Sequence, residues 1–463
     1  MYFYRMRNLL FFVMGLILFS CKKENITNDP SDLLQTSTDS LHFDTVFTST
    51  GSITQFVRII NNNNKAIIIS SVSLAGGSSS PFRINVDGVP GPEVNNLKIG
   101  ENDSAYIFVT VTINPDASTL PFIVRDSIGI SYNGNVQYIQ LDAYGRNAHF
   151  FRNRQISGIE TWNNDLPYVI LGGITVEANA ILNINKSCRI FMHADAPFIV
   201  NGTLNVNGEK YDSTRVVFTG DRLDEPYRHF PAGYPGIIFS NSSTNNVLNY
   251  ATIKNAYQGI VVTGPSSFTK LRLNETIIDN AYDAGILAIN SSIEARNVLV
   301  SNCGKNIFLV NGGQYNFTHC TAVSFSNNYI QHRNPVLVIS NFLNQEVNDL
   351  NAVFRNCIFW GEENGLVQNE VEVLKQGNSA FYVNFDQVLW NVQNAPGNII
   401  SSGIINNQDP DFEFINTADR IYNFRLKGNS PALEKGVNTG ILTDLDGNPR
   451  AVGLPDLGAY EKQ

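Results

Sequence analysis

Charge, cysteine and long apolar runs are all scarce in this chain of 463 residues. Only 16% of the residues are Asp, Glu, Lys or Arg, and the acidic ones outnumber the basic ones by 41 to 32. The net charge of −9 argues against a nucleic-acid partner, because binding to phosphates requires a basic face. After residue 20, no segment is apolar enough to span a membrane as a helix.

Cysteine is equally sparse, with five residues in the whole chain. Beyond Cys21, the others lie far apart without a C-x-x-C or Cys/His spacing; they are Cys188, Cys303, Cys320 and Cys357. This spacing argues against a zinc site and a disulfide framework, so we expect four small buried side chains and no metal. Glycine, with 35 residues, and asparagine are abundant, and both supply the positive φ values of tight turns.

The N-terminus has the organisation of an export signal. Arg5 and Arg7 precede an apolar run from Leu9 to Phe19, which is too short to cross a bilayer as a helix. The run ends LFSC, which resembles a bacterial lipobox, where cleavage precedes a cysteine that is then acylated. We predict a lipoprotein signal peptide over 1–20 and a lipid anchor in the membrane through Cys21. An ordinary secretory signal is the alternative.

A polar tether over 21–37 leads to a segment of strong β character. Residues 38–147 contain runs such as TQFVRIINNNNKAIIISSVSL and SAYIFVTVTINP, with period-two alternation between turns rich in Asn and Gly. About seven such strands in about a hundred residues are typical of an immunoglobulin-like β-sandwich. The segment resembles bacterial Ig-like modules found next to surface anchors, so we expect a spacer or binding module.

Residues 148–463 follow a different, repetitive pattern. The units LNYATIKNAYQGI, LNETIIDNAYDAGI, ARNVLVSNCGKNI and CTAVSFSNN superpose on one asparagine each. These asparagines, spaced 25, 22 and 25 residues apart, are Asn255, Asn280, Asn302 and Asn327. Apolar residues recur at fixed offsets before them, as the inward-facing side chains of stacked coils should. We therefore predict an all-β chain: an Ig-like sandwich followed by a right-handed parallel β-helix whose asparagines form a side-chain ladder. The leucine-rich repeat, the rival solenoid, has a consensus that does not fit.

Two stretches carry a family resemblance that covers about two-thirds of the chain. The run through VNGTLNVNG, VVFTGDRLDEPY and NNVLNYATIKNA resembles a family of Gram-negative right-handed β-helix lipoproteins, which implies a fold and a location without an established activity. The tail motifs FRLKGNSPALEKGVNTG, DLDGNPR and DLGAYE resemble the ends of exported β-helix proteins, which implies a C-terminal cap over about 408–463. The coil register beyond residue 359 stays open.

Parallel β-helices often carry polysaccharide lyases and glycoside hydrolases, and these chemistries need carboxylates on neighbouring coils. The column that precedes the asparagines contains one carboxylate, Asp279, beside Lys254, Ser301 and Ser326. Glu275 and Asp279 on one coil form a weak acid pair. The readable coils therefore favour a non-enzymatic role, although inserted loops could still build a site.

The loop GDRLDEPYRHFPAGYPG, residues 220–236, is the densest cluster of chemistry in the chain. Its catalytic candidates are Asp224, Glu225 and Arg228, as acid/base groups and an anion or sugar contact. Its ligand-binding candidates, with the tyrosines as stacking platforms, are Arg222, Tyr227, Arg228, His229 and Tyr234. The alternative, which we favour, is structural cover of the solenoid flank, with charges paired inside the loop and aromatic rings buried.

Two further features have plain structural readings. Asp444, Asp446 and Asn448 resemble part of a calcium loop, yet they lack the EF-hand spacing and its closing Glu, so a turn is favoured over Ca²⁺. His193, His319 and His332 have no triad partners nearby in the sequence.

The sequence predicts a lipid-anchored protein of the cell envelope, at the outer membrane, on its periplasmic or outer face. We expect non-enzymatic binding or adhesion, with a polysaccharide as the candidate ligand. A carbohydrate-active lyase or hydrolase with a loop-built site is one alternative, and a purely structural surface component is the other.

Overall fold

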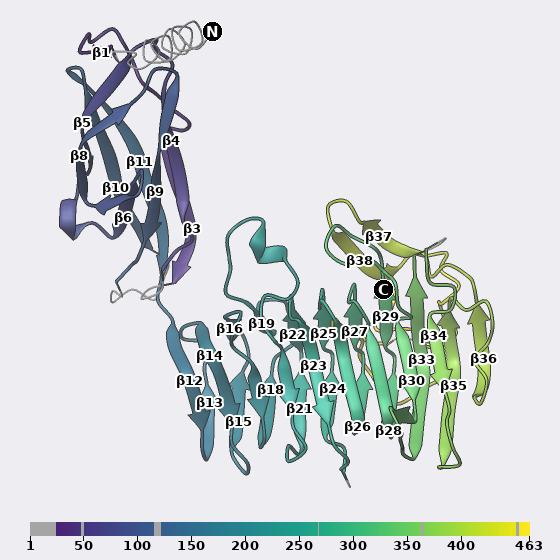
Figure 1. Ribbon diagram of the computed structural model, residues 1–463. Helices are drawn as coiled ribbons and strands as arrows, with labels where there is room; N and C mark the ends of the chain where they lie inside the picture. Colours follow the sequence, from purple (N-terminus) through teal and green to yellow (C-terminus); the bar gives the residue numbers. More distant parts are fainter. Residues whose placement is uncertain (1–24, 48–50, 115–121, 267, 363–364, 451–452) are drawn as a thin grey trace, which may run out of the picture. The chain divides into compact units, whose positions relative to one another are not determined.

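The computed structural model describes residues 25–47, 51–114, 122–266, 268–362, 365–450 and 453–463. The chain divides into two compact units, Met1–Asn147 and Ala148–Gln463. Within the described ranges the structure is almost entirely β, with two short 3₁₀ helices, η1 (Gly77–Ser79) and η2 (Tyr227–His229) (Figure 1). No helix of those ranges has the length and apolar character needed to cross a membrane. The predicted signal peptide and Cys21 lie outside the described residues.

The first unit is a two-sheet sandwich, as predicted, but it begins within the predicted tether 21–37, because Ile26–Thr27 and Gln35–Thr36 of that segment pair with strands of the two sheets. One sheet contains β1 (Ile26–Thr27), β3 (Ser40–Phe47), β5 (Ala66–Leu74), β8 (Glu93–Ile99), β10 (Phe122–Tyr132) and β11 (Asn135–Arg146). The other contains β2 (Gln35–Thr36), β4 (Gln55–Asn61), β6 (Phe82–Val86), β7 (Val89–Gly91) and β9 (Asp103–Val111). Alternate residues point inward, so that Ile107, Val109 and Val111 of β9 are buried against the facing sheet. The result is an immunoglobulin-like sandwich.

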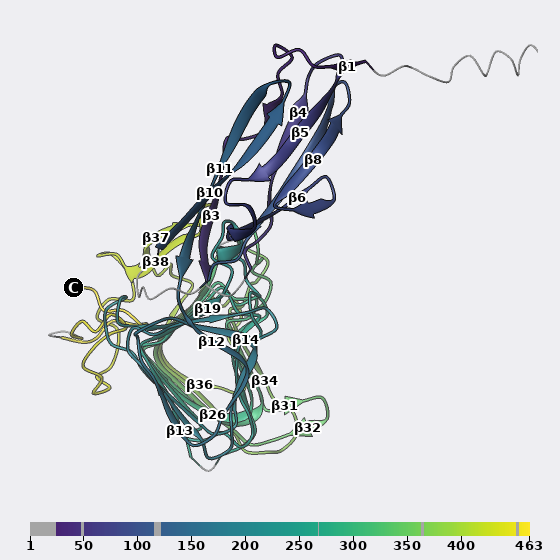
Figure 2. The same cartoon turned by 90° about the vertical axis from the view of Figure 1, so that its left-hand side faces the viewer.

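The second unit is a parallel β-helix in which strands pair with the coil above and below (Figure 2). Each coil adds a segment to three rows, which we call rows I, II and III in chain order. Row I contains β16 (Arg189–Met192), β19 (Val216–Gly220), β22 (Ala251–Lys254), β25 (Ile277–Asp279), β27 (Leu299–Ser301) and β29 (Thr321–Ser324). Row II contains β17 (Phe198–Val200), β20 (Ile237–Phe239), β23 (Gln258–Thr263), β30 (Leu337–Ser340) and β34 (Val371–Leu374). Row III contains β13 (Ile159–Trp162), β15 (Ile181–Asn185), β18 (Thr203–Asn207), β21 (Asn246–Asn249) and β24 (Leu271–Asn274).

Longer strands bend around a corner and serve two rows. β14 (Tyr168–Val176) belongs to rows I and II, and β26 (Ala284–Arg296) and β28 (Ile307–Thr318) belong to rows II and III. β33 (Leu350–Gly361) and β35 (Phe381–Trp390) belong to rows III and I, while β12 (His149–Ile156) and β36 (Ile400–Asn406) pair at the two ends of the ladder. The coils thus continue well beyond residue 359, where the sequence register could not be followed.

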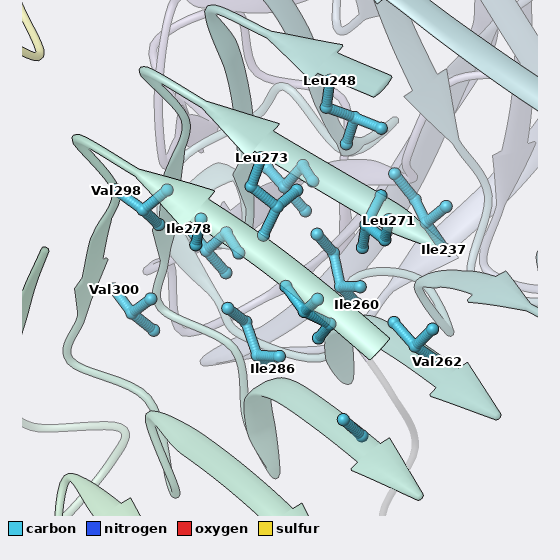
Figure 3. Packing of buried hydrophobic residues seen from close by; sticks show 14 of the residues in the cluster. Ile237, Leu248, Ile260, Val262, Leu271, Leu273, Ile278, Ile286, Val298 and Val300 are labelled. Carbon is cyan, nitrogen blue, oxygen red and sulfur yellow. The ribbon is translucent and has the colours of Figure 1, made fainter. Parts of the chain in front are cut away.

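The core of the β-helix is a set of aliphatic columns that run along its axis (Figure 3). Ile237, Ile260 and Ile286 stand opposite one another on successive coils of row II, and all are fully buried. Such stacking removes apolar surface from water at about 25 cal/mol per Å². Four cysteines share this core; as predicted, Cys188, Cys303, Cys320 and Cys357 are buried and free.

Residues with left-handed backbone mark the corners between rows. At corner I–II these are Asn255, Asn280 and Asn302, with φ values of 64°, 56° and 51°. At corner III–I they include Ser187, Tyr250, Glu275, Asn297, His319, Asn356 and Gln387. Asparagine tolerates this conformation better than other non-glycine residues, because its short side chain bonds to local backbone groups. The recurring asparagines of the sequence are therefore corner residues.

The register predicted for the fourth repeat is wrong by three residues. Ser301 pairs with Val323, so Ser324 takes the place on the next coil that Asn302 has on its own, and Asn327 does not. A longer corner follows β29, and Asn327 Oδ1 accepts hydrogen bonds from the backbone N–H groups of Tyr329 and Ile330 within it. The repeat pattern predicted Asn327 because it is the nearest asparagine, whereas the equivalent position is occupied by Ser324.

The C-terminal region, predicted as a cap over about 408–463, covers a flank of the solenoid. The hairpin of β37 (Phe412–Asn416) and β38 (Ile421–Leu426) packs its Phe412 and Phe424 in one cluster with outward-facing residues of row I, such as Leu299 and Trp360. The tail runs back as far as Arg215, whose guanidinium donates to Leu445 O. Row I is apolar on its outer side as well, and this explains why the tail lies there.

Candidate ligand-binding cleft

The corner asparagines hold the loop 220–236 in place between β19 and β20. Asn255 Nδ2 donates to Arg228 O at 2.9 Å, and Asn280 Nδ2 donates to His229 O at 3.0 Å. Asn280 Nδ2 also donates to Asn255 Oδ1 at 2.8 Å, which is one step of the predicted ladder. The ladder amides therefore also hold the backbone of the 220–236 loop, which is an insertion absent from the other repeats.

Most charged groups of the loop pair within it. Arg222 makes a bidentate contact to Asp224, with both N–O distances 2.8 Å, and its guanidinium lies 4.1 Å from the centre of the Tyr227 ring. Arg228 pairs with Glu225 at 2.6 Å, and both side chains are half exposed. The proposed catalytic carboxylates are thus engaged by neighbouring arginines, and one face of the proposed stacking ring is already covered.

Tyr234 does not contact a ligand as predicted, because it belongs to the core. Its side chain is 1% exposed and packs within the main aliphatic cluster of the β-helix. Burial raises the pKa of its hydroxyl, which has no hydrogen-bond partner. Asp221, at the start of the loop, pairs with His193 of the preceding coil at 2.7 Å.

The C-terminal hairpin meets the loop from the other side. Arg420, in the β37–β38 turn, donates to His229 O at 3.2 Å and lies 4.5 Å over the ring of Tyr329. Phe230 of the loop contacts the same ring, with centroids 4.7 Å apart. Both the loop and the hairpin rise from the same edge of the solenoid (Figure 1). Three segments far apart in the sequence therefore converge at corner I–II.

Between them lies a polar cleft of about 160 Å³. It is lined by His229, Lys254, Asn255, Asp279, Asn280, Asn302, Asn327, Asp419, Arg420 and Tyr422. A single water needs only about 10–15 Å³ of such space, so the cleft has room for a small polar ligand. Every lining side chain can donate or accept a hydrogen bond. His229 and the four predicted ladder residues, Asn327 included, all contribute to it.

Asp279 is the carboxylate at the floor of the cleft. Ser301 Oγ donates to its Oδ1 at 2.6 Å. Burial raises the pKa of Asp279, and the hydrogen bond from Ser301 and the charge of Lys254 act in the opposite direction. Tyr422 Oη is buried at the same site, on the side of Asn327. A carboxyl and a phenol are thus held where a ligand could satisfy them.

The second carboxylate of the cleft is Asp419, from the hairpin, and the weak pair predicted from the sequence does not form. Glu275 lies at corner III–I and Asp279 ends β25, so the two residues stand at opposite ends of one row I segment. Glu275 belongs to corner III–I, where its Oε1 accepts a hydrogen bond from Asn297 Nδ2 at 3.0 Å. No sequence signal could have paired Asp279 with Asp419, because the hairpin lies outside the repeat.

The remaining candidates have structural partners. Asp444 Oδ1 accepts hydrogen bonds from the backbone N–H groups of Asp446 and Asn448, and its Oδ2 accepts from that of Glu461. These bonds are those of a turn, and no cluster of three metal-binding side chains occurs in the described ranges. His319 and His332 are both buried, the latter bonded to Glu370 at 2.8 Å.

Comparison with known proteins gives no family assignment. No protein-family model matches the chain, and no curated protein matches it. Similar solved structures include a family 123 glycoside hydrolase from Clostridium perfringens, with 12% identity, 25% of this chain and 26% of that one covered, and a TM-score of 0.20. Pectate lyase Pel9A is 13% identical over 68% of this chain and 98% of its own, with a TM-score of 0.25. The family 87 α-1,3-glucanase from Streptomyces thermodiastaticus is 9% identical over 76% and 89%, with a TM-score of 0.20. The chain spans about a quarter of the first of these, and the fold rests on the strand pairing described above.

Proposed function

We propose that this protein binds a glycan of the cell envelope or its surroundings, with one sugar unit held in the cleft. The observation that carries the proposal is the convergence of Asp279, Arg420 and Tyr422 with the corner asparagines around one small polar space. Sugar hydroxyls both donate and accept hydrogen bonds. The cleft offers acceptors in its carboxylates, donors in its cations and both in its amides. Such a set matches a hydroxyl-rich ligand better than an apolar one.

The proposal includes a lipid anchor on Cys21, for which the lipobox-like sequence is the support. An acylated protein would keep the cleft close to a membrane surface, where envelope glycans are found. Mass spectrometry of the mature N-terminus tests this part separately. A Cys21 that carries acyl mass would support the anchor, and an N-terminus cleaved elsewhere without acyl mass would refute it.

A glycan array followed by calorimetry on the retained glycan tests the binding proposal. Asp279→Asn and Arg420→Ala should each weaken binding about tenfold or more, because each removes a charge-assisted hydrogen bond worth roughly 1.5–3 kcal/mol. Arg272→Ala is the matched control, since Arg272 pairs with Glu294 on the exposed side of row III. Equal affinity of all four proteins would refute the cleft as the site. Retention of no glycan at all would favour a purely structural surface protein.

A second candidate function is glycoside hydrolysis, and one observation favours it. Asp279 has a pKa raised by burial, as a general acid requires, and a second carboxylate, Asp419, lines the same cleft. An assay for reducing ends on the retained glycan decides between binding and hydrolysis. Product release that disappears in Asp419→Asn would establish the enzyme, and intact glycan after long incubation would leave binding as the function.

A further inference from the structure

A second, larger concavity lies at corner II–III. It has a volume of about 830 Å³ and is lined mainly by residues of four successive coils, carried on β26, β28, β33 and β35, with Pro265 and Ser266 from the coil before them. Val347, in the small hairpin of β31 (Phe342–Leu343) and β32 (Glu346–Val347), contributes to one wall. Four coils at about 4.8 Å spacing extend over roughly 14 Å along the helix axis. The groove shares no lining residue with the cleft.

One row of side chains crosses the groove along the axis. Gln314, Asn351 and Tyr382 stand opposite one another on β28, β33 and β35, and all three are exposed. In the described part of the chain, neither amide has a hydrogen-bond partner and the Tyr382 ring has no aromatic or cationic partner. Elsewhere on row III the amides of one column bond to each other, as Asn205 does to Asn183 at 3.0 Å. The groove therefore presents free donors, free acceptors and an open ring face.

The groove is also nearly free of charge. Among its lining residues the sole charged side chain is Asp349, whose Oδ1 accepts a hydrogen bond from the Ala380 N–H at 2.9 Å. Ser291, which is 2% exposed, lies in the wall with its Oγ unpartnered. No lining residue is a cation, and Lys375, which lies 5.5 Å from the centre of the Phe381 ring, is already engaged with that ring. The groove is therefore better suited to a ligand with neutral hydroxyl groups than to an anionic ligand.

We propose that this groove binds an extended, uncharged glycan chain along the helix axis. Tyr382 stacks on the face of one sugar ring, while Gln314 and Asn351 bond to hydroxyls of the rings that precede it. A chain bound in this way covers several coils, so it contacts more than one sugar unit. This site is distinct from the cleft at corner I–II and extends the proposed function to a second surface.

Calorimetry with neutral hexasaccharides tests the proposal, using β-1,3- and β-1,4-linked glucose and mannose oligomers as probes and a hexamer of galacturonic acid as the acidic counterpart. We expect a neutral hexamer to bind, with an affinity that does not change between low and high salt. Tyr382→Ala should weaken binding about tenfold, and Gln314→Ala with Asn351→Ala by a similar factor. Tyr211→Ala, which removes another exposed tyrosine far from the groove lining, is the matched control and should bind as the wild type does.

Three outcomes would overturn the proposal. They are wild-type affinity in Tyr382→Ala, salt-sensitive binding of the acidic hexamer alone, and no binding of any neutral hexamer. All three variants replace exposed side chains, so thermal unfolding close to that of the wild type should show that each one folds.

Discussion

Corners I–II and III–I are built by the same backbone device and end up with opposite properties. Both turn on residues with left-handed backbone, and both have asparagine amides directed outward. At corner III–I, Asn297 and Asn356 donate to Thr443 O and Val437 O, so the C-terminal tail closes the corner. At corner I–II, Asn255 and Asn280 hold a loop above the surface, and a cleft remains beneath it. The segment that packs on a corner therefore decides whether the corner is closed, as at III–I, or leaves a cleft, as at I–II.

The charges at the two corners differ accordingly. At corner III–I, Arg450 and Glu461 form an ion pair at 2.9 Å with side chains only 2% and 3% exposed. Arg450 also donates to Asn297 Oδ1 and to two carbonyl groups of the tail. At corner I–II, Asp279 and Arg420 line an open space and keep unused hydrogen-bonding capacity. The first arrangement stabilises the fold, and the second is available to a ligand.

The largest expected effect comes from the closed corner. Arg450→Met should lower the free energy of unfolding by about 3–5 kcal/mol, because it removes the buried cation that faces the Glu461 carboxylate. Adding Glu461→Gln to the same protein should recover part of this loss. Chemical denaturation of the single and double variants measures both. If Arg450→Met were as stable as the wild type, the contact between the tail and corner III–I would not stabilise the fold.

The next effect is a pH dependence at the same corner. Burial lowers the pKa of His319 to about 2, well below its ordinary value, and the charge of Arg450 acts in the same direction. The unfolded chain then binds a proton below about pH 6.5 that the folded protein does not, so stability falls as the pH falls, by up to about 1.4 kcal/mol per unit. His319→Asn should flatten this slope, as measured by unfolding between pH 7 and pH 5. An unchanged slope would place the acid sensitivity elsewhere.

A smaller effect of opposite sign is expected at the open corner. Because burial raises the pKa of Asp279, the folded protein keeps this proton to higher pH than the unfolded chain does, and stability falls as the pH rises through that range. At pH 7, Asp279→Asn should therefore raise the unfolding temperature, by about 1–2 °C for each kcal/mol relieved. The gain should vanish below about pH 4, where both states are protonated. A lower unfolding temperature of Asp279→Asn at pH 7 would mean that the Asp279 carboxylate stabilises the folded protein.

The smallest effect is expected in the loop itself. Arg222→Ala breaks an ion pair with Asp224 in which the arginine is half exposed, and this should change the free energy of unfolding by about 1 kcal/mol or less. Glycan binding should persist, since Arg222 does not line the cleft. Thermal unfolding and calorimetry check the two statements. Loss of glycan binding in this variant would show that the charged residues of the loop contribute to the binding site.

The fold could be predicted from the sequence because each repeat contains its own corner residue and its own buried residues, at constant spacing. Three of the four repeats were aligned correctly, since Asn255, Asn280 and Asn302 mark equal corners at constant offsets from buried residues. The fourth failed where an insertion lengthened the corner and a serine, Ser324, replaced the marker. Alternation in the first unit predicted a sandwich for the same reason, as its inward residues recur every second position.

The site was less accessible to sequence reasoning. The loop could be found by its composition, but Tyr234 belongs to the core, and its burial depends on coils that the loop itself does not reveal. Asp419, Arg420 and Tyr422 reach the cleft through the tail's packing on the outer side of row I. That contact depends on apolar residues such as Leu299 facing outward. In a repeat pattern these cannot be distinguished from core positions.

A crystal structure of the protein with the glycan selected by the array tests the central claim most directly. The account predicts a sugar ring in the cleft at corner I–II, within hydrogen-bonding distance of Asp279, Arg420 and Tyr422. A cleft that holds only water, with the glycan bound on the loop's outer charges or on the first unit, would contradict it.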